Sequence, residues 1–234
     1  MAITTTEHGD AHGDGAGHGD LAGSGGHHET AEQRDHKERL ALWIFVGGDA
    51  VFLLLELFTW FYLRALNTGG LWRGTSCTKA SPCTDGLGNP ITQEIAKANP
   101  WYSVGVAALA VISALLIWAV ERSSRNRDSR GVISGAAGLA LLALLATVAL
   151  QIYQFQVLPF TTIDGAYAST YEFFMGSTLA HLILVTFIGF GLWNRARQGR
   201  YDEGNWHRVR IIRFFAVWIA VTACVLTVVS SLFS

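Results

Sequence analysis

Residues 101–120 read WYSVGVAALAVISALLIWAV, a stretch without a charged side chain. A helix needs about 20 apolar residues to cross the hydrocarbon core of a bilayer. Four further segments are comparably apolar, at about 40–66, 132–158, 168–193 and 211–233. Their apolarity is continuous and rich in Leu and Ala, without the period-two alternation of a membrane β-barrel. The sequence therefore predicts an all-α, polytopic membrane protein with five transmembrane helices.

Composition and charge divide the chain into two parts. Half of the 234 residues are hydrophobic and only 15% are charged, which excludes an ordinary soluble domain. Residues 1–37 are rich in Gly, His and Asp and low in aromatic residues, so we expect a disordered cytoplasmic tail. Its charged end, from 32 to 39, is expected to begin the first helix at the membrane surface. Residues 38–234 form the five-helix membrane domain.

The tail repeats the triplet His-Gly-Asp at 8–10, 12–14 and 18–20. Imidazole and carboxylate groups spaced in this way could hold a divalent transition metal weakly. A solvated tail without a specific role is the simpler interpretation. We predict no metal site for the chain.

The lysines and arginines predict the orientation of the helices. With a cytoplasmic N-terminus, 13 of these 17 residues flank the cytoplasmic ends of the helices and 4 lie outside. Cytoplasmic segments carry the excess of basic residues in membrane proteins. We therefore expect a multi-pass protein of a bacterial inner (plasma) membrane, with its N-terminus in the cytoplasm and its C-terminus outside. Residues 1–39 lack the apolar region of a signal peptide, so the first helix is expected to direct insertion.

Two of the three cysteines, Cys77 and Cys83, lie in the loop between the first two segments. Charge places this loop outside, where the medium is oxidising, so a disulfide between them is plausible and two free thiols are the alternative. Cys224 lies within the last segment and is expected to be a small packing residue.

Two carboxyl groups interrupt the first apolar segment. Asp49 and Glu56 are seven residues apart and so lie on one face of a helix. An ionised Asp at the centre of a transmembrane helix costs about 2.5–3.5 kcal/mol on an insertion scale. Each carboxyl either hydrogen-bonds a neighbouring helix as part of the packing or serves as a proton-exchanging or lipid-contacting group. Both interpretations stand for Asp49, and packing is preferred for Glu56.

A specific sequence pattern leads into the fourth apolar segment, at residues 160–182, FTTIDGAYASTYEFFMGSTLAHL. The pattern resembles the third subunits of haem–copper terminal oxidases, the cytochrome c oxidase subunit III family. In that family a Thr-Ile-x-Asp-Gly-x-Tyr-x-Ser-Thr run leads into a helix that contains Gly and His. The residues that carry the resemblance are Thr162, Asp164, Gly165, Tyr167, Ser169, Thr170, Gly176 and His181.

Other segments also resemble this family, but several of their residues differ from its motifs. The chain therefore resembles a divergent bacterial member of the family. Residues 44–49 resemble the family's Leu-Phe-x-x-Ser-Glu motif, with Asp49 in place of the commoner Glu. Gln154 stands where the family commonly has Glu. Of the family's Gly-x-His-x-x-His only His181 remains, although Thr178 shares its helix face and could form a hydrogen-bonded pair with it. The last segment lacks the family's Trp-His-Phe-x-Asp motif.

The resemblance implies a non-catalytic component of a respiratory cytochrome c oxidase in aerobic electron transport. Such a subunit binds the catalytic subunit I (and II), which hold the haem and copper, and supports proton uptake. It carries no redox cofactor, and it holds phospholipid in a cleft between helices one and two and helices three to five. By this resemblance, the residues that line the cleft or the subunit contact are Asp49, Glu56, Glu172, Thr178 and His181.

The residues themselves argue against a catalytic centre in this chain. Beyond residue 37 the chain has two histidines, His181 and His207, whereas an oxidase core needs several within the membrane. Two alternatives remain open: a related subunit that assists a nitric oxide reductase, and a stand-alone metal-handling membrane protein that collects metal with its tail. We expect membrane lipid as a partner and no nucleic acid.

Overall fold

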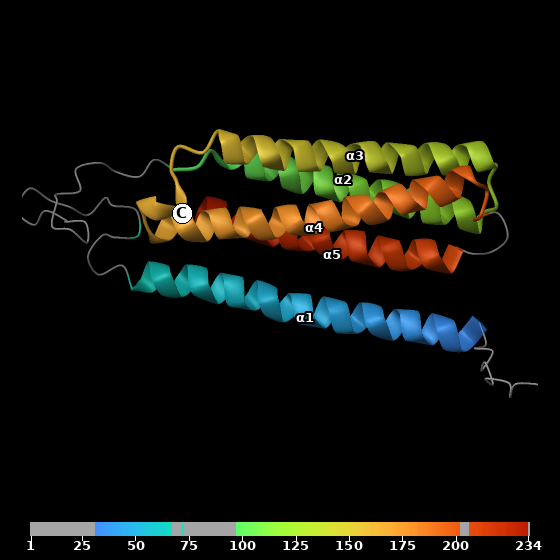
Figure 1. Cartoon of the computed structure of the whole chain (residues 1–234), viewed down its shortest axis with the longest axis horizontal. Helices are drawn as coiled ribbons and strands as arrows, with labels where there is room; N and C mark the ends of the chain where they lie inside the picture. Colours follow the sequence, from blue (N-terminus) through green and yellow to red (C-terminus); the bar gives the residue numbers. More distant parts are fainter. Residues whose placement is uncertain (1–30, 67–71, 73–96, 202–205, 234) are drawn as a thin grey trace, which may run out of the picture.

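A computed structural model of the chain describes residues 31–66, 72, 97–201 and 206–233. These ranges form five long α-helices and one short 3-10 helix, η1 (Figure 1). The predicted tail up to residue 30 and the Cys77–Cys83 pair lie outside the described residues. The elements, in chain order, are α1 (Ala31–Ala65), α2 (Pro100–Arg125), α3 (Arg130–Gln156), η1 (Thr162–Asp164), α4 (Ala166–Arg197) and α5 (Trp206–Leu232).

The structure confirms an all-α protein with five helices long and apolar enough to cross a membrane. The helices extend past the predicted apolar segments, mainly into the charged residues that flank them. α1 begins at Ala31, so the charged stretch from 32 to 39 lies at the start of the first helix, as expected. Ala, Glu, Gln, Arg and Lys predominate there and favour a helix that continues beyond the apolar span.

The helix ends follow from local residues. Pro100 opens α2, because proline fits a first helical position, and the Asn99 side chain accepts a 3.1 Å bond from the backbone N–H of Trp101. At the other end of the bundle, the guanidinium of Arg130 donates from Nε and Nη2 to the Arg197 carbonyl oxygen, the Nε bond measuring 2.8 Å. This contact joins the start of α3 to the end of α4 and satisfies a terminal carbonyl.

The helices α2 to α5 form a four-helix bundle, and α1 lies beside it (Figure 1). Around the bundle, α2 packs on α3 and α5, and α4 packs on the same two helices. Small residues line the contact of α2 with α5 and let the backbones approach closely. The buried ones include Ala110, Ala114, Ala216, Ala220 and Ala223.

The expected grouping of helices one and two against three to five is wrong. Between their described residues, α1 and α2 make no contact, and α1 instead packs on α4 and α5. The short segment 126–129 holds α2 next to α3, whereas the long connection 66–99 imposes no such neighbourhood on α1 and α2.

Aromatic rings pack α1 against the bundle at the end where α2 and α4 begin. Trp60 of α1 is fully buried, with its ring 5.0 Å from Trp72, 5.0 Å from Phe174 and 5.7 Å from Tyr167, centroid to centroid. Such ring pairs contribute about 0.5–1.5 kcal/mol each beyond the area they bury. This cluster is therefore one of the main attachments of α1.

We predict that Trp60→Ala destabilises the protein by about 3 kcal/mol, the lower end of the range for removing a buried Trp. Unfolding of the purified chain in mild detergent, titrated with a denaturing detergent, measures the change. The matched control is Phe58→Ala, an aromatic on the same helix that is 64% exposed and should change stability little. An equal loss in both variants would contradict the assignment of Trp60 as an anchor.

Candidate functional site

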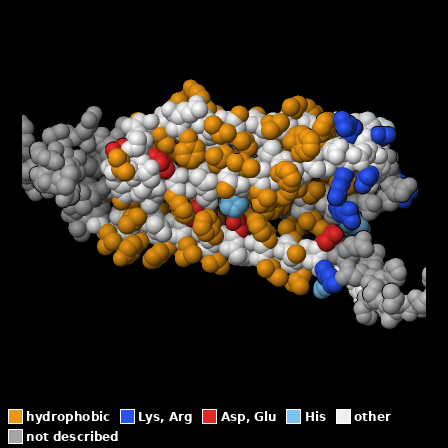
Figure 2. All heavy atoms as spheres, viewed as in Figure 1, with side chains coloured by type: hydrophobic (Ala, Val, Ile, Leu, Met, Phe, Trp, Pro, Cys, Tyr) orange, Lys and Arg blue, Asp and Glu red, His pale blue; other side chains and the backbone are white. Residues whose placement is uncertain are grey.

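Asp49 lies where α1 meets α4 and α5. Its Oδ1 is 2.7 Å from Nε2 of His181 on α4, and its Oδ2 accepts a 2.5 Å hydrogen bond from the indole Nε1 of Trp218 on α5. The Asp49 and His181 side chains are only 10% and 18% exposed. In Figure 2, pale blue histidine atoms lie against red carboxyl-bearing side chains midway along the apolar surface. One carboxyl group thus joins three helices inside the membrane span.

The hydrogen bonds of His181 determine how many protons the pair holds. Its Nδ1 lies 2.8 Å from the Ser177 carbonyl oxygen, which can only accept, so Nδ1 carries a hydrogen. The contact between Nε2 and Asp49 Oδ1 then holds one further proton, on one atom or the other. An acid beside a neutral imidazole and a carboxylate beside an imidazolium both sum to zero charge. The pair is therefore neutral as a unit and avoids the cost of a lone charge in the membrane.

Glu56 lies two turns further along α1 and lines the same small cavity, about 10 Å³ in volume. Glu56 is 2% exposed, and Ser177 lines the cavity beside it. Its Oε1 has no hydrogen-bond partner. A buried polar atom without a hydrogen-bond partner destabilises the protein by about 1–3 kcal/mol. Glu56 is therefore the group of this cavity with spare hydrogen-bonding capacity.

The predicted residues Asp49, Glu56, Thr178 and His181 all line this cavity. The suggested bond between Thr178 and His181 is absent: the Thr178 hydroxyl donates to the Phe174 carbonyl, one turn back on its own helix, at 2.9 Å. Glu172 is not part of the site. Its carboxyl accepts a 2.9 Å bond from the Thr162 hydroxyl, near the start of α4.

The other residues of the 160–176 motif build the turn that leads into α4. The Thr161 backbone N–H and hydroxyl both donate to the Asp164 carboxylate, which caps η1. Gly165 has φ 145°, a conformation that residues with a side chain rarely adopt. Tyr167 is 1% exposed and belongs to the aromatic cluster around Trp60.

Ser169 and Thr170 complete this turn by donating their hydroxyls to the Ala166 carbonyl. Gly176 faces open space, since a side chain there would meet nothing within 4 Å. The motif therefore fixes the start of α4, and with it the register that places His181 opposite Asp49.

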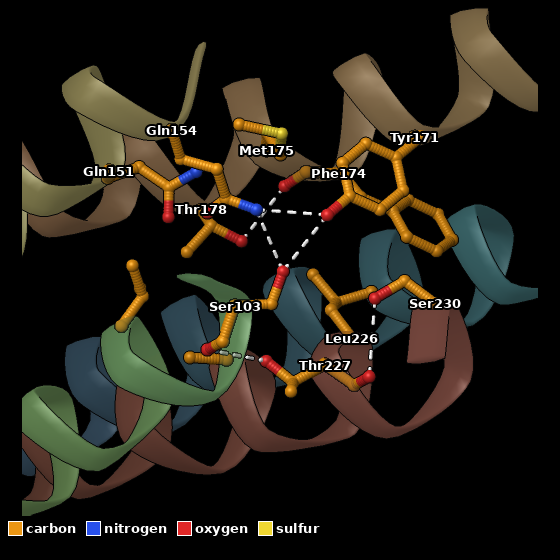
Figure 3. A pocket seen from close by; sticks show the side chains of 12 residues that line it. Ser103, Gln151, Gln154, Tyr171, Phe174, Met175, Thr178, Leu226, Thr227 and Ser230 are labelled. Atoms are coloured by element: carbon orange, nitrogen blue, oxygen red, sulfur yellow. Dashed lines mark hydrogen bonds between the residues drawn. The ribbon is translucent and has the colours of Figure 1, made fainter. Parts of the chain in front are cut away.

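A second polar cluster lies inside the bundle, where Gln154 of α3, Ser103 of α2 and Tyr171 of α4 converge (Figure 3). The Gln154 amide donates to the Ser103 hydroxyl at 2.8 Å and to the Tyr171 hydroxyl at 2.9 Å. These residues line a cavity of about 30 Å³, enough for one water. Thr178 lines both this cavity and the one beside Asp49, so the two polar clusters adjoin.

Sequence reasoning missed Trp218, Ser177, Ser103 and Tyr171 as members of these clusters. An indole N–H inside an apolar span usually finds a hydrogen-bond partner, so Trp218 on the last helix was a readable signal. Gln154 was noted for the charge that it lacks, whereas the structure uses its amide as the centre of a buried network.

The site has no obvious place for a metal ion. Within the part of the chain that the structure describes, no three or more His, Cys, Asp and Glu side chains gather as a metal site requires. What the geometry offers is one shared proton between Asp49 and His181, with a second carboxyl in the same cavity. No protein-family model and no curated protein matches the sequence.

We predict that Asp49→Leu destabilises the chain by several kcal/mol and that Asp49→Asn is tolerated. Leucine leaves His181 Nε2 and Trp218 Nε1 without a partner, at about 1–3 kcal/mol each. An asparagine amide can donate to neutral Nε2 and accept from the indole. Denaturation of the purified variants in mild detergent tests this. An equal loss in both variants would mean that charge, rather than hydrogen bonding, holds the three helices.

Proposed function

We propose that this chain is a non-catalytic, subunit III-type component of a respiratory cytochrome c oxidase in a bacterial inner membrane. In this role it binds the catalytic subunit, which holds the haem and copper. One observation carries the proposal. The two segments that resemble the family most directly, 44–49 and 160–182, meet at the 2.7 Å contact of Asp49 with His181. A shared proton at this contact suits a subunit that supports proton uptake.

In this proposal the phospholipid occupies the groove between α1 and α5, rather than a cleft between helices one and two and helices three to five. This groove has a volume of about 470 Å³ and is lined mainly by apolar side chains of α1 and α5. Arg39 and Arg210 lie at its mouth, and Trp218, which holds Asp49, lines it as well. A lipid here stabilises the docking of α1 and the position of the Trp218 indole.

The proposed orientation, with a cytoplasmic N-terminus, is supported by one strongly basic end of the molecule. We call the end where α1, α3 and α5 begin the basic end. Lysine and arginine side chains gather there in Figure 2. At the opposite end, the described basic residues are Arg64 and Lys97.

The exposed, apolar outer surface of α1 supports the proposal of a protein partner. In the most apolar part of α1, 6% of the residues are buried within this chain, compared with 28–39% in the other four helices. Large exposed side chains cover this surface, among them Trp43, Leu54 and Phe58. In the proposed complex, a catalytic subunit covers part of it.

A nitric oxide reductase partner is the second candidate. Gln154, an uncharged residue 2% exposed, replaces the family's Glu in the bundle interior and is compatible with a subunit of a different reductase. The stand-alone metal-handling alternative depends on the His-Gly-Asp tail, which lies outside the described residues.

We predict that a haem–copper catalytic subunit copurifies with the affinity-tagged chain in gentle detergent. A haem spectrum, oxygen consumption and mass spectrometry of the partners identify the complex. The matched control is the Trp60→Ala variant, which should lose the partner together with the docking of α1. Recovery of a nitric oxide reductase core would move the chain to the second candidate. A haem-free chain without partners, from cells whose oxidase is intact, would contradict both.

We also predict that Asp49→Asn changes turnover, or shortens the active lifetime of the purified complex, without loss of assembly. Asparagine keeps the hydrogen bonds but cannot share a proton with His181. Ser113→Ala is the control, because this buried hydroxyl bonds the Leu109 carbonyl within its own helix. Unchanged kinetics in Asp49→Asn would remove Asp49 from the functional residues.

A further inference from the structure

The cavity beside Gln154, Ser103 and Tyr171 has more hydrogen-bonding capacity than its own side chains use. Its volume is about 30 Å³, and none of the residues that line it is exposed. One water molecule needs about 10–15 Å³ of such space and two to four polar partners. We propose that this cavity is a built water site, in which one or two bound waters join α3 to α2, α4 and α5 (Figure 3).

A count of hydrogens in the cluster leaves one donor and one acceptor without a partner. The Gln154 amide nitrogen uses both of its hydrogens on the hydroxyls of Ser103 and Tyr171. These hydroxyl oxygens lie 3.0 Å apart, so one donates to the other, and the remaining hydroxyl hydrogen forms no bond within the described part of the chain. The buried Oε1 of Gln154 likewise has no donor there. A water that accepts from the hydroxyl and donates to Oε1 completes the network.

Gln151 adds a second amide to the same lining. It lies one turn before Gln154 on α3, and residues three apart share a helix face. Gln151 is 2% exposed, lines the cavity, and forms no side-chain hydrogen bond to another described residue. Buried polar groups are almost always hydrogen-bonded to protein or to ordered water. Water in the cavity is therefore the partner that this amide can reach.

The rest of the polar lining consists of acceptors. Three hydroxyls already donate to backbone carbonyls, those of Thr178, Thr227 and Ser230. Their oxygen atoms can still accept a hydrogen bond. The described residues that line the cavity include no charged side chain, and a lone charge inside a membrane span is costly. A ligand that fits this lining is thus neutral, donates and accepts hydrogen bonds, and is no larger than one or two waters.

The water site adjoins the cavity beside Asp49, because Thr178 and Leu226 line both. Glu56 provides a second buried acceptor there, since its Oε1 has no partner among the described residues. The bound waters thus extend the polar interior of the molecule from Glu56 on α1 to Gln151 on α3. This inference concerns the chain alone and does not depend on the proposed oxidase partner.

The test uses Met175, which lines the water site and is 5% exposed. X-rays split a bound water into hydroxyl radicals, and radicals formed beside a methionine oxidise it to the sulfoxide. The full-length Leu144→Met variant in mild detergent is irradiated briefly, and mass spectrometry compares both methionines within one molecule. Leu144→Met is a volume-conserving change at a 2% exposed position in the apolar cluster of the bundle. We expect Met175 to oxidise several-fold faster than the methionine introduced at position 144.

The double variant Gln151→Leu/Gln154→Leu replaces both amides by apolar groups. It should lower the oxidation rate of Met175 to that of the methionine introduced at position 144. Equal rates at the two positions, with both glutamines in place, would show that the cavity is dry and would overturn the inference, whether or not the double variant folds. Fast oxidation of Met175 that persists in a folded double variant would mean that radicals arrive from bulk solvent, and the inference would then be wrong as well.

Discussion

A carboxyl group inside an apolar helix has to find its hydrogen-bond partners on other helices, because lipid offers none. Asp49 meets this constraint by bonding His181 of α4 and Trp218 of α5. The arrangement is neutral as a unit, so it satisfies the carboxyl without placing a net charge in the membrane. The same bonds help to set where α1 lies, together with the aromatic cluster around Trp60. The position of a whole helix therefore depends on one polar and one aromatic attachment.

Two kinds of packing coexist in the molecule, and each leaves its own groove. Within the bundle, small residues such as Ala114 and Ala220 bring α2 and α5 close, and the larger residues beside them enclose a channel. Between α1 and the bundle, contact is made by the aromatic cluster at Trp60, which joins α1 to α4, and by the polar site at Asp49, which joins it to α4 and α5. The remaining length stays open towards the basic end. Both grooves thus combine apolar walls with arginines at one end.

The sequence predicted what is local and left out what depends on distant pairing. Hydropathy located all five helices, and helical periodicity placed Asp49 and Glu56 on one face, because both signals lie within a short window. The pairing of α1 with α4 and α5 was not predictable in this way, since it depends on contacts between residues far apart in the chain. Trp218 was missed for the same reason, and the grouping drawn from the resemblance was wrong. Gln154 shows a further limit: a substitution that removes a charge can keep a buried hydrogen-bonding role.

The partners of Asp49 lie far along the chain, and this separation has a consequence for synthesis. His181 follows Asp49 by 132 residues and Trp218 by 169. At about 5–20 residues per second, α1 leaves the ribosome on the order of ten seconds before either partner exists. During this interval the helix carries a carboxyl that costs about 2.5–3.5 kcal/mol to insert. The first helix of this protein therefore enters the membrane as an incomplete element, and its final place is decided only when the last helix arrives.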